Sequence, residues 1–100
     1  FRDGCCNTGP LDQGMHTVCA IVTDEFLEFS KAAGNDLSTP RPEFGFVGLN
    51  DGDQWCLCAA RWEQARQAGK APKIRLAATN QASLAVCRLG DLKMHAIDLN

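Results

Sequence analysis

The residues best suited to chemistry in this 100-residue chain are six cysteines and two histidines. Thiolates serve as nucleophiles, redox centres and metal ligands, and imidazole serves as a base or a metal ligand. Two of the cysteines are adjacent in FRDGCCNTG, and two others flank one leucine in QWCLC. The full set comprises Cys5, Cys6, His16, Cys19, Cys56, Cys58, Cys87 and His95. Metal binding, thiol chemistry and simple packing are therefore the alternatives for these side chains.

A structural zinc site usually takes four thiolate or imidazole ligands, often from Cys-x2–4-Cys pairs, and this spacing is missing here. Cys56 and Cys58 are two apart, which places both sulfurs on one face of a strand. His16 and Cys19 point to opposite faces of a regular strand, so they share a site only if the strand begins after His16 or contains a bulge. No cofactor is expected; the alternative is zinc bound by Cys5, Cys6, Cys19, Cys56 and Cys58, with or without His16.

Thiol chemistry needs a cysteine whose anion is stabilised by a helix N-terminus or by a nearby cation. Cys58 directly precedes a predicted helix, so we expect it to be the most reactive thiol, with Cys6 second and His16 as the base. A disulfide between the adjacent Cys5 and Cys6 would be strained. The alternative is that one of them pairs with Cys19 or Cys58 across the fold.

Six cysteines also permit a disulfide framework with 15 connectivities. The cysteines lie inside apolar segments such as VCAIV and WCLCAA, whereas disulfide scaffolds are usually loop-rich. Free cysteine packs like a small apolar residue, and Cys19 and Cys87 have apolar neighbours of that kind. We therefore expect reduced thiols and a cytoplasmic protein.

The irregular segment 35–53 is the second candidate for a binding element, because loops this long are often functional. Pro40 and Pro42 bracket Arg41 and favour an extended backbone there, which would display its guanidinium to a carboxylate or phosphate. The binding residues predicted for a small anionic ligand are Asn35, Asp36, Ser38, Arg41 and Trp55.

A structural interpretation of the same loop is favoured over the binding one. Asn35 and Asp36 would form an Asx turn, and Arg41 would pair with Asp36 or Glu43. Its apolar residues predict that the loop packs onto the body of the protein. They are Phe44, Phe46, Val47 and Leu49.

Hydrophobic periodicity and capping residues predict the elements that must position these side chains. Thr23 caps a helix that Gly34 ends, and Trp62 lies on the core face of a later helix, beside Arg61 as a capping or solvated residue. Asp91 is the predicted cap of a last helix, in which His95 is a solvated or hydrogen-bonded side chain. The predicted elements are strands 16–22, 54–58 and 73–78, helices 23–34, 59–69 and 90–99, and one helical turn capped by Thr79.

This order predicts an α+β (or small α/β) fold in one compact domain over residues 1–100. A small mixed sheet of about three to four strands would be covered by two main helices plus short C-terminal helices. A thin sheet is completed by a preceding strand or by a second copy of the chain, so a homo-oligomer is one expectation. The net charge of −2 without a basic stripe argues against nucleic acid, and no apolar run reaches the roughly 20 residues of a membrane span.

Three blocks of the sequence together resemble a bacterial family catalogued as a domain of unknown function, number twenty-two thirty-seven in its series. The blocks are FRDGCCNTGPLDQGMHTVCA, EFLEFSKAAGNDLSTPRPEFGFVGL and GDQWCLCAARWEQARQAGKAPKIRLAAT, which cover nearly all of the chain. The resemblance implies a single small domain whose family N-terminal extension is absent here. It implies no particular reaction.

We therefore expect a small soluble, cytoplasmic binding or interaction domain with a Cys-rich pocket bordered by loop 35–53. The ligand would be a small anion or a protein partner. The alternatives are a thiol-dependent enzyme or redox protein that uses Cys58 or Cys6, and the zinc domain. All three predict that FRDGCC, loop 35–53 and the start of helix 59–68 meet in space.

Overall fold

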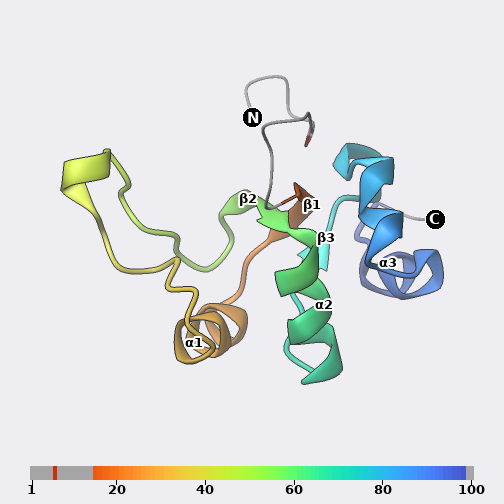
Figure 1. The fold of residues 1–100 in the computed structure, drawn as a ribbon, viewed down its shortest axis with the longest axis horizontal. Helices are drawn as coiled ribbons and strands as arrows, with labels where there is room; N and C mark the ends of the chain where they lie inside the picture. Colours follow the sequence, from red (N-terminus) through yellow and green to blue (C-terminus); the bar gives the residue numbers. More distant parts are fainter. Residues whose placement is uncertain (1–5, 7–14, 99–100) are drawn as a thin grey trace.

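A three-stranded sheet with the order β2-β1-β3 organises the chain. The computed structural model describes residue 6 and residues 15–98. The strands are β1 (His16–Ile21), β2 (Gln54–Cys58) and β3 (Lys73–Ile74), and the helices are α1 (Asp24–Ala32), α2 (Ala59–Gln67) and α3 (Leu89–His95). Short 3-10 helices occur at Pro42–Phe44, Leu76–Ala78 and Gln81–Ala85. The predicted α+β domain is confirmed (Figure 1).

The central strand β1 pairs antiparallel with both of its neighbours. Val18 lies opposite Leu57 on one side, and Ala20 lies opposite Ile74 on the other. The sheet was predicted to be mixed; in the described part of the chain its parallel component is a single bridge between Ile74 and Ala96. Antiparallel strands need only short connections, but here each connection contains a helix, and these helices supply the second layer.

A β-bulge interrupts the pairing of β1 with β2 between His16 and Val18. His16 lies opposite Cys58 and Val18 opposite Leu57, so Thr17 is the extra residue. Its buried hydroxyl donates to the Met15 carbonyl at 3.1 Å and accepts from the Ser83 hydroxyl at 2.7 Å. The bulge changes the direction in which the side chains at the start of β1 project, relative to those in the rest of the strand.

The first helix begins and ends where the capping residues predict. The Thr23 hydroxyl accepts a hydrogen bond from the Phe26 N–H at 3.1 Å, and Asp24 lies in the positively polarised first turn. Phe26 is buried against the sheet, and Gly34 follows the helix with a φ of 94°. Such a backbone angle favours glycine, which explains why the helix stops there.

One hydrophobic core lies between the sheet and helices α1, α2 and α3. Trp62 is fully buried at its centre, as predicted, and its indole N–H donates to the Pro72 carbonyl at 3.3 Å. Full burial of an aromatic side chain contributes on the order of 2 kcal/mol, provided its polar atom is satisfied. The other large side chains of this core are Val18, Val22, Phe26, Leu57, Ile74 and Leu92.

The predicted strand 73–78 is too long, because β3 ends at Ile74. The Asp98 carboxylate accepts from the Leu76 N–H at 2.8 Å and the Ala77 N–H at 3.0 Å, which stabilises a 3-10 turn instead. Hydrogen bonds from Ala77 and Leu76 hold the pKa of Asp98 below its usual range. The Asp98 carboxylate thus accepts the N–H groups that a neighbouring strand would otherwise bind.

Two predicted caps in the C-terminal part are also wrong. Asp91 lies in the first turn of α3, which begins two residues earlier at Leu89. Asn80 caps the turn that was assigned to Thr79, by accepting from the Ala82 N–H at 2.8 Å. The Thr79 hydroxyl instead accepts from the Cys19 N–H at 3.1 Å, so it fastens this turn to β1.

Loop 35–53 begins with the Asx turn that the sequence predicts. The Asp36 carboxylate accepts from the backbone N–H groups of Ser38 and Thr39 at 3.0 and 3.1 Å. Hydrogen bonds from Thr39 and Ser38 hold the pKa of Asp36 well below its usual range. No ion pair joins Arg41 to Asp36 or Glu43 within the described residues, so that part of the structural interpretation is wrong.

The tip of this loop projects from the body as an arm (Figure 1). Arg41 and Phe46 exchange backbone hydrogen bonds of 2.7 and 3.1 Å around the 3-10 turn. Phe44 and Val47 are 81% and 84% exposed, so the prediction that they pack onto the body is wrong. Leu49 is buried as expected, because the backbone pairing of Leu49 with Leu37 brings the base of the arm back to the core.

Replacing Gly48 by alanine is expected to destabilise the base of this arm. Gly48 has a φ of 83°, and an added Cβ would lie 2.5 Å from the Ser38 carbonyl oxygen. Gly45 also has a positive φ, of 68°, but nothing lies within 4 Å of its added Cβ. We expect Gly45→Ala to lower the free energy of unfolding by about 1 kcal/mol and Gly48→Ala by about 3 kcal/mol, measured by urea denaturation. Equal losses in the two variants would contradict this packing.

Candidate functional site

A disulfide joins Cys6 to Cys56, with the two Cα atoms 5.6 Å apart. The Cys6 N–H also donates to the Ala78 carbonyl at 2.9 Å, and its side chain is buried. The expectation of reduced thiols is therefore wrong for this pair, and so are the predicted partners Cys19 and Cys58. The hydrogen bond from Cys6 to Ala78 joins segments that are distant in sequence, and it holds Cys6 beside Cys56 rather than beside the predicted partners.

The zinc alternative requires free thiolates as ligands. Two of the five proposed sulfurs are bonded to each other, and Cys5 lies outside the described residues. Among the residues that the structure describes, no group of three or more His, Cys, Asp or Glu side chains could hold a metal ion.

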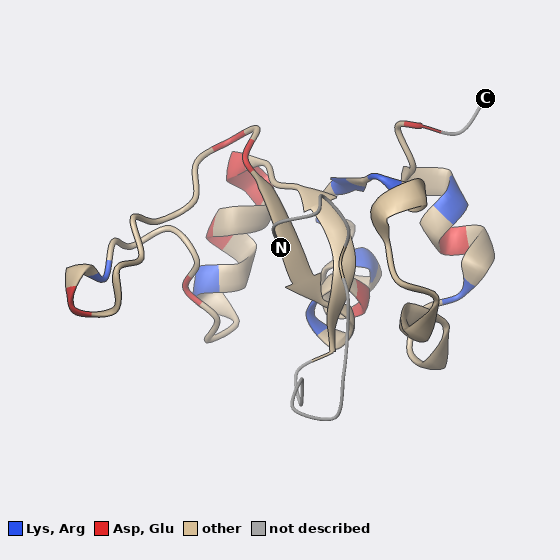
Figure 2. Cartoon of the chain, turned by 90° about the horizontal axis from the view of Figure 1, so that it is seen from above, with Lys and Arg blue, Asp and Glu red and all other residues tan. Residues whose placement is uncertain are grey.

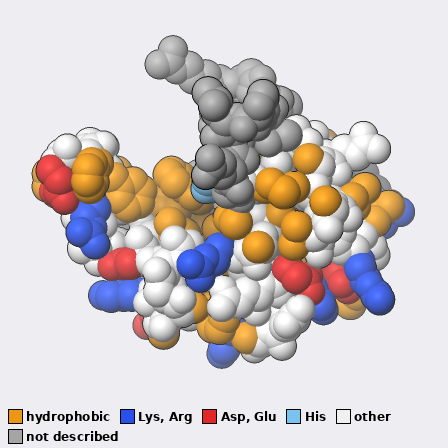
Figure 3. All heavy atoms as spheres, viewed as in Figure 1, with side chains coloured by type: hydrophobic (Ala, Val, Ile, Leu, Met, Phe, Trp, Pro, Cys, Tyr) orange, Lys and Arg blue, Asp and Glu red, His pale blue; other side chains and the backbone are white. Residues whose placement is uncertain are grey.

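A pocket of about 240 Å³ lies where β2 passes into α2. Asn35 and Leu37, at the start of loop 35–53, form another part of its lining. Figure 3 shows the surface hollowed between the projecting arm and the body, with hydrophobic side chains in the hollow. The lining residues are His16, Asn35, Leu37, Trp55, Leu57, Cys58 and Arg61.

The polar end of this pocket lies at the N-terminus of α2. Cys58 is a half-buried free cysteine that directly precedes the helix, and its own side chain makes no capping hydrogen bond. The Ala59 N–H donates to the Met15 carbonyl at 3.1 Å, and the N-terminal end of the helix dipole carries partial positive charge, which favours an anion. Because His16 lies opposite Cys58 across the bulge, its imidazole belongs to the same pocket.

Arg61 supplies the full positive charge of the pocket. Its Nη1 donates to the Ala33 carbonyl and to the Gln64 side-chain oxygen, both at 3.3 Å. These bonds anchor the guanidinium between α1 and α2, as its expected capping role requires. The guanidinium has five N–H donors in a planar fork, so donors remain for a ligand.

An apolar trough of about 480 Å³ adjoins this pocket along the arm. Trp55 lines both spaces, and its ring lies 5.7 Å from that of Phe46. The exposed side chains of Phe44 and Val47 form the outer part of the trough. The two spaces together offer a charged end and an apolar end joined by one indole ring.

The structure brings together only some of the residues predicted for the site. His16, Asn35, Trp55 and Cys58 line the pocket. The three other predicted binding residues, Asp36, Ser38 and Arg41, do not line either space. The predicted meeting of loop 35–53 with the start of helix 59–68 occurs at Asn35 and Leu37, which share the pocket with Cys58. Arg41 instead lies on the arm, at the start of its 3-10 turn.

Sequence reasoning missed Arg61 as a site residue, although a signal for it exists. It lies three residues after Cys58 at the beginning of a helix, where i and i+3 side chains are neighbours. Leu37 and Leu57 were also missed, because only the folded chain brings the start of the loop against β2.

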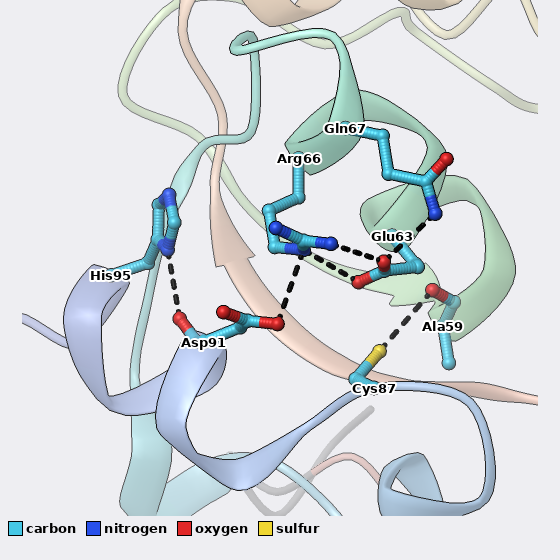
Figure 4. Close-up of polar contacts among 7 residues, drawn as sticks. All are labelled: Ala59, Glu63, Arg66, Gln67, Cys87, Asp91 and His95. Carbon is cyan, nitrogen blue, oxygen red and sulfur yellow. Dashed lines mark hydrogen bonds and ion pairs between the residues drawn. The ribbon is translucent and has the colours of Figure 1, made fainter.

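The remaining free cysteines pack as predicted. Cys19 and Cys87 are 1% and 3% exposed, and burial raises the pKa of both thiols, that of Cys87 to about 11. The Cys87 thiol donates to the Ala59 carbonyl at 3.5 Å (Figure 4). Both thiols are therefore less reactive at neutral pH than an exposed thiol.

A cluster of charged residues between α2 and α3 has a structural role (Figure 4). Arg66 binds Glu63 through two hydrogen bonds of 2.8 and 2.7 Å, and its Nε lies 3.4 Å from Asp91. The hydrogen bonds from Arg66 lower the pKa of Glu63 to about 2. His95 is satisfied as predicted, with Nδ1 2.8 Å from the Asp91 carbonyl oxygen and its ring edge-on to Trp62.

Fold and pocket define a small α+β domain with a ligand-sized pocket at a strand–helix junction. The chain belongs to the bacterial family described as "Uncharacterized protein conserved in bacteria (DUF2237)", whose profile matches residues 1–96, and the resemblance seen in the sequence is thereby confirmed. A search of curated proteins finds no match. No helix in the described part of the chain is long and apolar enough to cross a membrane.

Replacing Glu63 by glutamine is expected to remove part of the pH dependence of stability. Because the native pKa of about 2 lies below the ordinary value of 4.5, the carboxylate stabilises the fold above pH 4.5. This contribution is lost as the pH falls towards 2. Urea denaturation should show Glu63→Gln less stable than the wild type at pH 7, with the difference narrowing below pH 4.5.

The matched control is Glu28→Gln, which removes the same charge from an exposed position of α1. It should track the wild type across this pH range. A constant difference between wild type and Glu63→Gln down to pH 2 would contradict the role given to this carboxylate.

Proposed function

We propose that this chain is a binding domain for a small organic anion with an apolar portion. The observation that carries the proposal is the position of Arg61, whose anchored guanidinium shares a pocket with His16, Asn35 and the N-terminus of α2. A carboxylate or phosphate placed there would gain charge-assisted hydrogen bonds from the guanidinium and favourable interaction with the helix dipole.

The apolar portion of the ligand would lie along Trp55 in the trough beneath the arm. Small-molecule sites are usually concave spaces of about 300–1,000 Å³ with mostly apolar walls and a few polar groups. The trough, of about 480 Å³ and mainly apolar, lies within this range, and the smaller pocket of about 240 Å³ adds the polar groups. Basic and acidic residues alternate along the helices in Figure 2 without a basic stripe, so nucleic acid is not the proposed partner.

A second candidate function is thiol chemistry in the same pocket. It is favoured by the free Cys58, which is half-buried beside His16 and Arg61. Cys58 would be the nucleophile and His16 the base. The preferred reagents would be anionic electrophiles, because a cation beside the thiol attracts them.

A cytoplasmic location is part of the proposal. Three described cysteines are free, which suits a reducing compartment. In such a compartment the Cys6–Cys56 disulfide would be formed or reduced according to the redox state of the cell, and it would not be a permanent structural bond.

The anion preference of the pocket is tested by alkylation of Cys58 with iodoacetate and with neutral iodoacetamide. The ratio of the two rates cancels any change in the fraction of thiolate, and buried Cys19 and Cys87 should label slowly. Removing the charge in Arg61→Gln should lower the ratio about fourfold. Two unit charges about 5 Å apart in water interact by about 0.8 kcal/mol, which corresponds to that factor.

Arg41→Gln is the charge-matched control, because Arg41 lies on the arm and does not line the pocket. It should leave the ratio unchanged. An equal fall of the rate ratio in both variants, or an unchanged ratio in Arg61→Gln, would contradict the proposed anion site.

Octanoate tests the combination of a charged and an apolar end. It should change the fluorescence of Trp55, which lines both spaces, while octanol should bind more weakly. Trp55→Phe removes the responding ring and leaves buried Trp62 as the background. Cys58→Ser should retain octanoate binding if the chain is a binding domain. Equal affinity for octanoate and octanol in the wild type would contradict the charged end.

A further inference from the structure

A free thiol lies directly beside the disulfide. Cys19 on β1 is the register partner of Cys56 on β2, and Cys56 is bonded to Cys6. Cys19 itself is free and 1% exposed. Three sulfur atoms therefore gather on one part of the sheet, apart from the pocket in which Cys58 lies.

The hydrogen bonds of β1 define which kind of cross-strand pair this is. The Val22 N–H donates to the Asp53 carbonyl at 2.9 Å, whereas the Cys19 carbonyl accepts from Arg75 beyond β3 at 2.9 Å. Because hydrogen-bonded and non-hydrogen-bonded pairs alternate, Cys19 and Cys56 form a non-hydrogen-bonded pair. The Cα atoms of such a pair are about 4.5 Å apart, within the distance that a disulfide bridges.

The side chains of Cys19 and Cys56 also share a face of the sheet. Directly opposed residues project to the same side, and neighbouring residues project to the other. Val18 and Ala20 enter the hydrophobic core, so Cys19 points to the opposite face, where Thr79 contacts its backbone. A bond between Cys19 and Cys56 therefore requires no change of register.

We propose that Cys6, Cys19 and Cys56 form a thiol–disulfide exchange centre. The Cys19 sulfur attacks the sulfur of Cys56, a Cys19–Cys56 bond forms, and the Cys6–Cys56 bond breaks. The bonding electron pair leaves with the Cys6 sulfur, which takes up the proton that Cys19 has lost. One disulfide and one thiol are present before and after the step, so no external oxidant or reductant is consumed.

The exchange releases a covalent tether. In the Cys6–Cys56 state, the segment ahead of β1 is bonded to β2; in the Cys19–Cys56 state, that link is absent and Cys6 is a thiol. The hydrogen bond from the Cys6 N–H to the Ala78 carbonyl does not depend on the disulfide and would remain. Burial and Asp98 raise the pKa of Cys19 while Arg75 lowers it, so the step is slow at neutral pH and faster at alkaline pH.

The first test uses Cys6→Ser, in which Cys56 has no disulfide partner. Oxidised glutathione converts the Cys56 thiol to a mixed disulfide and releases one reduced glutathione. Cys19 should then attack the Cys56 sulfur, form Cys19–Cys56 and release the second reduced glutathione. Peptide mapping after an acid quench should show the mixed disulfide decaying at least about tenfold faster in Cys6→Ser than in the double variant with Cys19→Ala.

The double variant of Cys6→Ser with Cys58→Ser is the matched control, and it should resolve the mixed disulfide as fast as Cys6→Ser alone. Equal persistence with and without Cys19, or slow resolution when Cys58 is absent, would overturn the assignment. Circular dichroism checks that the variants fold.

A second measurement needs no variant of the disulfide itself. Wild-type protein held at pH 8.5 with iodoacetamide should accumulate chains alkylated at Cys6 and linked between Cys19 and Cys56. Cys19→Ala should accumulate none. Wild-type chains alkylated at Cys19 with the Cys6–Cys56 bond intact would contradict the exchange.

Discussion

The bulge at Thr17 is the constraint on which the rest of the structure depends. Side chains alternate along a strand, so one extra residue reverses which face each later residue occupies. Before the bulge, His16 lies opposite Cys58 and belongs to the pocket; after it, Cys19 lies opposite Cys56 beside the disulfide. The bulge is held by a part-buried hydrogen bond from Thr17 to Met15 and a buried one from Ser83 to Thr17. Every described buried side-chain polar atom has such a partner, and an unpaired one would cost about 1–3 kcal/mol.

A contact between distant segments and a local turn together shape the pocket. Arg61 joins the end of α1 to the start of α2, and the carboxylate of Asp36 fixes the turn from which the arm departs. The close approach of Gly48 to Ser38 closes the base of the arm and leaves its tip exposed. The pocket therefore lies between rigid elements on one side and a projecting loop on the other, an arrangement common in binding sites.

Local patterns predicted the elements well where one segment determines its own structure. The Thr23 cap, the end of the first helix and the buried face of Trp62 are of this kind. Prediction failed where a partner comes from far along the chain: Asp98 ends β3 early, and Ala78 positions Cys6 for Cys56. Four of the eight residues predicted for catalysis or binding line the pocket, because the bulge and the turn after α1 bring them there. Arg41 was favoured over Arg61 because its two prolines are visible in the sequence, whereas the anchoring of Arg61 is a tertiary contact.

The central claim is that an anion binds beside His16 at the junction of β2 and α2. The chain has only two histidines, so their ring resonances are readily assigned by NMR. His95 lies between Trp62 and Asp91 and serves as the internal reference. Titration with octanoate should move the ring resonances of His16 in a saturable way and leave those of His95 in place. Resonances of His16 that do not move, or equal movement of both rings, would contradict the account.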